Sequence, residues 1–236
     1  MRYAILAAGE GSRLYQEGIK VSKPLVTIGG ETLLERLLRL FQANDATSIC
    51  ISANREKADL TRYLARLQLA NPMIDTVLCC PPSSMHSLYE LSSRLKGQPF
   101  CLTTVDTVFR EDEFSRYVAE LDRVIATGEA DGLMGVTDYI DDEKPLYVQV
   151  DDETGCISRF LDTDPHPRYV SAGIYGLTPQ SLQTLSACIE RGESRMRNFQ
   201  RALLNDGFRL KAFLFSHVFD IDHASDIEKA EDFLSL

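Results

Sequence analysis

The sequence has no long apolar run, since no stretch approaches the roughly 18 residues that a membrane-spanning helix needs. It opens directly in a strand-like segment, without the charged and then apolar stretches of a secretory signal. Basic residues are scarce, because 25 lysines and arginines face 35 aspartates and glutamates, for a net charge of −10. This balance argues against broad binding of nucleic acid, which depends on lysine and arginine at the phosphates. We therefore expect a cytoplasmic protein that binds neither membranes nor nucleic acid.

Cysteine spacing gives no sign of a metal or redox motif. The six cysteines are scattered without any CxxC pair, and several stand in apolar runs that are typical of buried strands. We therefore expect them to be reduced thiols packed in the core of a protein from a reducing compartment.

Hydrophobic periodicity predicts strands and helices in strict alternation over the first half of the chain. A β-α-β-α order of this kind favours a largely parallel sheet with helices on both faces. Such sheets bind ligands at the carboxyl ends of their strands. Strands are expected at 2–8, 48–52, 74–80 and 99–106, and helices at 33–44, 58–67, 87–95 and 113–126.

The second half changes character, because short strand patterns follow one another and are joined by turns such as DDETG. No stretch resembles a linker and no repeat is present, so we expect one domain over residues 1–236 with a mixed extension of the sheet. The closing helix is expected to be capped by Ser225, with Glu228 three residues on. Strands are expected at 130–137, 145–152, 156–162, 168–178 and 209–222, and helices at 179–192, 195–207 and 225–236.

The first expected strand ends in AAGEGSRL, where Gly9 and Gly11 are followed by Arg13. Residues without Cβ let backbone N–H groups approach a ligand closely and form a nest suited to phosphate oxygens. The dinucleotide fingerprint GxGxxG is excluded because Leu14 stands at its third glycine position, and the P-loop GxxxxGK[ST] is absent. A plain strand-to-helix turn is the alternative, which the nearby Arg13 and Lys-Pro pair disfavour.

Lys23 stands ten residues after Arg13 and directly before Pro24. A residue before proline is restricted to extended conformations, so the lysine side chain should be aimed in one direction. Taken alone, Lys23 would be an ordinary surface lysine. Beside the glycine pair and Arg13, it is a candidate phosphate ligand.

The segments LAAGEGSRL and KPL together resemble the signature of the sugar-phosphate nucleotidyltransferase family. The likeness extends to TTVDTVF, YVSAGIYGLTP and VFDIDHASDIEKAE, and so covers nearly the whole chain. It implies a Rossmann-like three-layer α/β/α sandwich with a mixed, mostly parallel sheet. In such an enzyme Arg13 and Lys23 would be catalytic. The resemblance gives as nucleotide-binding residues Ala7, Ala8, Gly9, Glu10, Gly11, Ser12, Arg13 and Lys23.

The same resemblance implies a Mg²⁺ site. Asp106 stands where the family places a strand-ending metal aspartate, although Val105 precedes it here in place of the usual glycine. The second ligand is expected from DID near the end of the sequence, where Asp222 is favoured over Asp220. Positions two apart share one face of a regular strand, so a strand end or a bulge is needed to separate them. Two carboxylates from distant strands suit Mg²⁺, which prefers oxygen ligands.

Three residues are candidates for binding the acceptor substrate. Lys144 and Arg168 each stand just ahead of an expected strand, so either could meet a phosphate, with an ordinary surface position as the alternative. Gly173 lies between small residues, where a substrate could approach the backbone. The segment CCPPSSMHSLYEL falls where the family reads the nucleobase, but its detail identifies no base.

These inferences define an expected activity: Mg²⁺-dependent transfer of a nucleoside monophosphate from a nucleoside triphosphate to a phosphorylated sugar, polyol or other alcohol, with release of pyrophosphate. CTP is preferred as the donor, and the acceptor stays open. The alternatives are a guanylyltransferase of the molybdenum-cofactor type, which shares the opening motif, and a nucleotide-binding regulator without catalysis. The expected partners are the nucleotide and a small phosphorylated acceptor, and a homodimer is left open.

Overall fold

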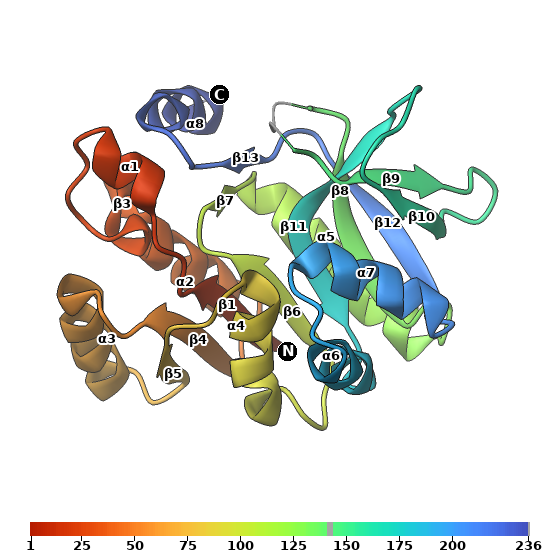
Figure 1. Cartoon of the computed structure of the whole chain (residues 1–236), viewed down its shortest axis with the longest axis horizontal. Coiled ribbons are helices and arrows are strands. Elements are labelled where there is room, and N and C mark those ends of the chain that lie inside the picture. Colours follow the sequence, from red (N-terminus) through yellow and green to blue (C-terminus); the bar gives the residue numbers. More distant parts are fainter. Residues whose placement is uncertain (141–143, 236) are drawn as a thin grey trace.

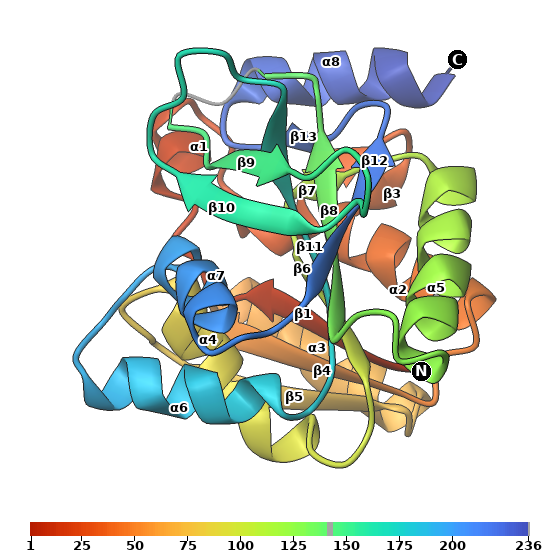
Figure 2. The ribbon, with the colours of Figure 1, turned by 90° about the vertical axis from the view of Figure 1, so that its right-hand side faces the viewer.

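The chain forms a mixed nine-stranded sheet enclosed between two layers of helices (Figures 1 and 2). The computed structural model describes residues 1–140 and 144–235, so Leu236, the last residue of the expected closing helix, lies outside the described residues. The three-layer α/β/α architecture predicted from the sequence is confirmed.

The elements follow the predicted alternation. The main sheet contains β1 (Arg2–Ala7), β4 (Ser48–Asn54), β5 (Ile74–Cys79), β6 (Phe100–Thr104), β8 (Gly132–Thr137), β9 (Tyr147–Val150), β10 (Ile157–Leu161), β11 (Tyr169–Leu177) and β12 (Leu210–Phe215). Two small ladders pair β2 (Thr27–Ile28) with β3 (Glu31–Thr32) and β7 (Thr107–Val108) with β13 (Phe219–Asp220). The helices are α1 (Ser12–Gln16), α2 (Leu33–Ala43), α3 (Ala58–Ala70), α4 (Ser84–Leu91), α5 (Glu111–Ala126), α6 (Ser181–Glu190), α7 (Met196–Asn205) and α8 (Ala224–Ser235), with 3₁₀ turns η1 (Lys23–Leu25) and η2 (Ser92–Arg94). Within the described ranges, every helix is too short or too polar to span a lipid bilayer.

The centre of the sheet is parallel, because β5, β4, β1 and β6 pair in that order and in one direction. Beyond β6 the sheet becomes mixed: β11 runs antiparallel to β6, β8 and β9, and β12 pairs in parallel with β8. The predicted parallel half and mixed extension are therefore both confirmed. The carboxyl ends of the four central strands lie along one edge of the sheet, where ligands bind in folds of this kind.

The helices bury a separate core on each face of the sheet. On one face α2, α3 and α5 pack around aromatic side chains that include Tyr3, Phe41 and Phe114, and the rings of Tyr3 and Phe41 stack at 4.3 Å. On the other face α4, α6 and α7 pack around fully buried side chains such as Leu88 and Phe199. Both faces of the sheet are thus covered, which explains why its central strands are apolar almost throughout.

Helix α2 begins with a reciprocal cap. The Thr32 side chain accepts the backbone N–H of Glu35 at 3.1 Å, and the Glu35 carboxylate accepts the backbone N–H of Thr32 at 3.0 Å. Two N–H groups that have no partner within the helix are satisfied in this way. The helix ends before Asn44, as its apolar spacing predicts. This cap fixes the start of α2, which follows η1 in the chain. The predicted site residue Lys23 lies in η1.

The expected strand at 209–222 is wrong as a single element, because it splits into β12 and β13. The break has a physical cause in a buried carboxylate of α5. Glu113 accepts the backbone N–H of Ser216 at 3.0 Å and its hydroxyl at 3.1 Å. Since this N–H is taken by Glu113, the strand ends at Phe215 and the chain turns toward β7. The turn carries the last part of the sequence across to the carboxyl edge of the central strands.

The predicted Ser225 cap of the closing helix is also wrong, because α8 begins at Ala224 and Ser225 lies in its first turn. Other carboxylates bind the free N–H groups at this end. Asp226 accepts the N–H of His223 at 2.7 Å, and Glu17 accepts the N–H of Ala224 at 2.7 Å. Acidic groups at a helix start also complement its dipole. Glu17 follows α1, so this contact ties the two ends of the chain together.

The expectation that all six cysteines are core thiols is wrong for two of them, because Cys80 is exposed and Cys156 is only partly buried. Cys80 is exposed, because β5 ends one residue earlier and the chain turns outward there. All six cysteines are free thiols, and the five other than Cys80 are at least half-buried: Cys50, Cys79, Cys101, Cys156 and Cys188.

Gly176 of β11 provides a test of packing against α5. A Cβ at this position would collide with the side chain of Leu121 and lie 2.8 Å from the hydroxyl oxygen of Tyr117. Both neighbours are fully buried, and the Tyr117 hydroxyl donates to the carbonyl of Leu133 at 2.7 Å. We expect Gly176→Ala to lower the free energy of unfolding by about 1–3 kcal/mol, measured by urea denaturation, because overpacking forces a fixed core to shift.

Gly9→Ala is the control for this substitution, because a Cβ at Gly9 meets nothing within 4 Å. Its unfolding midpoint should stay close to that of the parent protein. A Gly176→Ala variant as stable as the parent would contradict the packing described between β11 and α5.

Candidate active site

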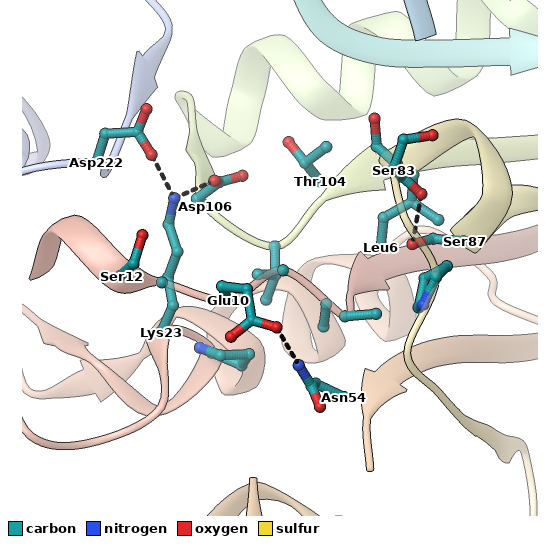
Figure 3. Close-up of a pocket in the computed structure, with 18 of the residues that line it drawn as sticks. Leu6, Glu10, Ser12, Lys23, Asn54, Ser83, Ser87, Thr104, Asp106 and Asp222 are labelled. Atoms are coloured by element: carbon teal, nitrogen blue, oxygen red, sulfur yellow. Dashed lines mark hydrogen bonds and ion pairs between the residues drawn. The ribbon is translucent and has the colours of Figure 1, made fainter. Parts of the chain in front are cut away.

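A cavity of about 510 Å³ opens at the carboxyl ends of β1, β4, β5 and β6 (Figure 3). Its volume is in the range of pockets that bind small molecules, and its place is the one where sheets of this topology bind ligands. The walls come from the loop after β1, the 3₁₀ turn η1, the end of β4, the loop before α4 and the turn after β6. Every residue predicted to bind nucleotide lines this cavity, from Ala7 to Arg13 together with Lys23.

The loop after β1 needs glycine at one defined point. Gly11 has a φ of +62°, which a residue with a side chain adopts only under strain. A Cβ there would also lie 3.2 Å from the Cβ of Lys23, which is tighter than an ordinary contact. Gly11 therefore lets η1 pack directly against the loop. This close approach brings Lys23 into the cavity.

Lys23 lies in η1 and not in the extended conformation that its position before Pro24 predicts. The preceding Ser22 is the extended residue, and its backbone N–H and hydroxyl both bind Asp59 on α3. Anchored from that side, the chain turns one residue earlier than expected. The lysine side chain nevertheless has a single direction, as predicted, and its ammonium group is nearly buried.

Asp106 and Asp222 converge on the ammonium group of Lys23. The Lys23 Nζ donates to a carboxylate oxygen of Asp106 and, at 2.7 Å, to Oδ1 of Asp222 (Figure 3). The other oxygen of Asp222 accepts from Nη1 of Arg13 at 2.9 Å. Four residues that are far apart in the sequence therefore form one charged centre. They come from the end of the glycine loop, from η1, from the turn after β6 and from the segment after β13.

The charges in this centre shift the pKa of Lys23 and of Asp222. Burial on its own lowers the pKa of the Lys23 ammonium, but the charges of Asp106 and Asp222 outweigh burial and raise the pKa above its usual value. Burial tends to raise the pKa of Asp222, but Lys23 and Arg13 hold it below the ordinary value. Both shifts favour the charged form, so the Lys23 ammonium and the Asp222 carboxylate are charged at neutral pH.

Asp220 and Asp222 are separated by a strand end, the condition that the sequence pattern requires. Strand β13 ends at Asp220, and the N–H of Asp222 turns back to the carbonyl of Asp220 at 3.0 Å. Asp220 then accepts from the hydroxyl of Thr107 at 3.2 Å, whereas Asp222 faces Lys23. The N–H of Ile221 donates to the carbonyl of Asp106 at 3.1 Å and holds the turn in place. Of the two carboxylates, Asp222 is the one that shares a cation with Asp106.

The donor set fits Mg²⁺ as a shared ion. Among the described residues no three His, Cys, Asp or Glu side chains are grouped closely enough to enclose a metal. Asp106 and Asp222 still meet at one cation, the Lys23 ammonium. Proteins commonly bind Mg²⁺ through one or two carboxylates, with water and substrate phosphates completing its coordination. Two converging carboxylates beside a phosphate-sized nest match that pattern.

A second cavity of about 300 Å³ adjoins the first and shares Arg13 and Asp222 with it. Its other walls come from the ends of β8 and β11, from β13 and from the first turns of α8. Aromatic side chains of Tyr139 and Phe219 line it, with ring centroids 5.3 Å apart. The charged centre therefore stands between two cavities, which is the arrangement that two reacting substrates require.

The predicted acceptor residues are not brought together. Lys144 and Arg168 line neither of these two cavities, and Arg168 pairs with Asp152 at 2.5 Å on the exposed end of the β9–β10 hairpin. Gly173 is closer to the centre, because a Cβ there would lie 3.1 Å from the hydroxyl oxygen of Thr107. Its φ of +71° also favours glycine. The acceptor roles of these three residues stay predictions.

Several site residues were missed by the sequence reasoning. Asn54 ends β4 and lines the first cavity, and the rule that ligands bind at carboxyl ends of strands was a signal for it. Thr104 and Thr107 flank the turn of Asp106, with their hydroxyl oxygens 2.5 Å apart. Tyr139 and Phe219 had no sequence signal, because a single aromatic residue is usually a core residue.

Fold and site together place this chain among the α/β proteins that bind nucleotides at the carboxyl edge of a parallel sheet. Comparison with protein families is more specific. The model of the MobA-like NTP transferase domain matches residues 3–203, so the chain belongs to this family. The match confirms the resemblance seen in the sequence. Comparison with curated protein sequences gives no match.

Solved structures of low sequence identity share the fold. A protein from Bacillus anthracis described as a glucose-1-phosphate thymidylyltransferase has a TM-score of 0.83 at 19% identity, over 99% of this chain and 94% of that one. The inositol-1-phosphate CTP transferase from T. maritima has a TM-score of 0.75 at 18% identity, over 100% and 98%. CTP:phosphocholine cytidylyltransferase from Streptococcus pneumoniae has a TM-score of 0.77 at 15% identity, over 98% of each chain.

Proposed function

We propose that this protein transfers a nucleoside monophosphate, with CTP as donor, to a phosphorylated sugar, polyol or other alcohol and releases pyrophosphate. The observation that carries the proposal is the charged centre of Lys23, Arg13, Asp106 and Asp222 between two cavities. The first cavity has the glycine loop of a nucleotide site, and the second is of a size for a small acceptor. Membership of the NTP transferase family supports the same reaction.

The reaction requires charge neutralisation more than a covalent nucleophile, because a phosphomonoester oxygen attacks the α-phosphorus of a polyanion. Backbone N–H groups of the loop from Gly9 to Arg13 would bind phosphate oxygens. Arg13 would hold the leaving pyrophosphate, and Lys23 would neutralise charge between the donor and acceptor phosphates. Mg²⁺, when held by Asp106 and Asp222, would supply further positive charge at the reacting phosphates.

The acceptor would lie in the second cavity with its phosphate toward Arg13 and the remainder toward Tyr139 and Phe219. Similar solved structures include proteins named for inositol-1-phosphate and for phosphocholine, which supports an alcohol or polyol phosphate as acceptor class. The proposal also includes a cytoplasmic setting, which the reduced cysteines support. A homodimer stays open.

Pyrophosphate release is the direct test. The protein is incubated with Mg²⁺, each of the four nucleoside triphosphates and a panel of acceptors such as glucose 1-phosphate, inositol 1-phosphate and phosphocholine. We expect release that depends on both substrates, fastest with CTP. Nucleotide binding without pyrophosphate release from any pair of substrates would favour the regulator. A guanine-containing product would favour the guanylyltransferase alternative, which agrees with the description of the family as MobA-like.

A further inference from the structure

Glu10 places a carboxylate in the nucleotide cavity away from the charged centre. It lies between the two glycines of the loop and lines the cavity with Asn54 and Cys80. In Figure 3 the Glu10 carboxylate is joined to the Asn54 side chain and points away from Asp106 and Asp222. The Glu10 carboxylate is therefore turned toward Asn54 at the end of β4 and takes no part in the ion pairs at Lys23.

Asn54 holds the Glu10 carboxylate in one orientation. Asn54 is 2% exposed, and its Nδ2 donates to Oε1 of Glu10 at 3.4 Å. Its Oδ1 accepts the backbone N–H of Glu56 at 2.9 Å and the thiol of Cys80 at 3.4 Å. Both the nitrogen and the oxygen of the Asn54 amide are hydrogen-bonded, so a 180° flip of the amide would break these bonds. The second carboxylate oxygen of Glu10 remains available to a ligand.

Glu10 pairs with no basic side chain within residues 1–140 and 144–235. A carboxylate without a cation is unfavourable in a cavity that receives a triphosphate, because like charges repel at this distance. Its presence is accounted for if it accepts hydrogen bonds from a neutral donor on the ligand. The part of a nucleotide that reaches away from the phosphates and carries such donors is the base.

We propose that Glu10, oriented by Asn54, reads an exocyclic amino group on the nucleobase and so selects cytosine over uracil and thymine. Cytosine carries an N4 amino donor at the position where uracil and thymine carry the O4 acceptor. The carboxylate accepts from the amino group but repels the carbonyl oxygen. This inference rests on the proposed function, because it requires that the cavity bind a nucleoside triphosphate. It adds the residue that sets the choice of base.

The test is the ratio of dissociation constants for CTP and UTP with Mg²⁺, measured by calorimetry for the parent protein, Glu10→Gln and Glu10→Ala. A contact of this kind discriminates by roughly ten- to a hundred-fold. The parent should therefore bind CTP more tightly than UTP by about that factor. In Glu10→Gln the ratio should fall toward one, because an amide offers a donor or an acceptor. Glu10→Ala should lose CTP affinity and gain UTP affinity, because the contact to the amino group and the repulsion of the carbonyl oxygen are both removed.

Glu56→Gln is the matched control, because Glu56 is an exposed carboxylate close to Asn54 that does not line the cavity. Its ratio should equal that of the parent. If the parent binds CTP and UTP equally, or if Glu10→Gln retains the parent ratio, Glu10 does not read the base. If ATP or GTP, whose bases also carry an amino group, binds more tightly than CTP, the choice of cytosine is refuted.

Binding and turnover separate the two proposals. Discrimination in binding that falls in Glu10→Gln, without pyrophosphate release by the parent, would support base reading and refute the transfer reaction. Release from UTP as readily as from CTP, with equal affinities, would refute base reading and support the transfer reaction. Absence of binding by every nucleoside triphosphate would overturn both.

Discussion

Lys23→Ala is expected to lower the rate of pyrophosphate release by about 10²- to 10³-fold, the usual cost of removing one preorganised charge at a developing anion. Lys23 is the residue at which the two carboxylates of the site meet, and it lines the first cavity beside Asp222, which both cavities share. Its removal leaves donor and acceptor phosphates without that neutralising charge. Arg13→Ala is expected to lower the rate of pyrophosphate release by a similar factor, since Arg13 would hold the leaving pyrophosphate.

Lys20→Ala is the control for this experiment, because Lys20 is an exposed lysine of the same segment that lines neither cavity. It should turn over at the parent rate. Circular dichroism spectra of all variants should match, since none of the three side chains packs in the core. Parent-like turnover in both Lys23→Ala and Arg13→Ala would show that the glycine loop is not the nucleotide site.

Asp106→Asn is expected to abolish most Mg²⁺-dependent activity while nucleotide binding is partly retained. The substitution keeps the shape of the side chain but removes the negative charge that a hard cation prefers. The backbone of the glycine loop is untouched, so the triphosphate keeps part of its contacts. The measurement is the Mg²⁺ concentration for half-maximal pyrophosphate release, together with the dissociation constant of the nucleotide.

The two aspartates near the end of the sequence should differ in the same assay. Asp222→Asn should raise the Mg²⁺ requirement strongly, because Asp222 converges with Asp106 on one cation. Asp220→Asn should raise it less, because Asp220 binds the Thr107 hydroxyl. Asp112→Asn, an exposed position on α5, is the control. An inactive Asp220→Asn variant beside an unaffected Asp222→Asn variant would transfer the ligand role to Asp220.

The parts of the site that lie close together in the sequence could be predicted from it. The glycine loop follows a buried strand, and the conformation of Gly11 that admits Lys23 is a local property of this loop. The carboxyl ends of β1 and β6 meet because parallel strands share an edge, so the nearness of Arg13 to Asp106 also follows from the β-α-β-α pattern.

The parts that depend on distant contacts could not be predicted. The separation of Asp220 from Asp222 depends on the end of β13, where the N–H of Ile221 donates to the carbonyl of Asp106, a residue far away in the sequence. No local pattern reveals that contact. The positions of Lys144 and Arg168 depend in the same way on where the β9–β10 hairpin lies. Periodicity predicts such a hairpin but not the direction in which its end points.

The path of the chain from β13 to α8 has a consequence for how the enzyme is made. Asp222 belongs to a segment that leaves the ribosome after every other part of the charged centre, and it lies beyond the residues that the family model matches. Before this segment emerges, the nascent chain contains only the other parts of the charged centre. Its site would then hold Lys23 and Asp106 without the second carboxylate. Convergence of both carboxylates on Lys23 therefore waits until the chain has been made as far as Asp222.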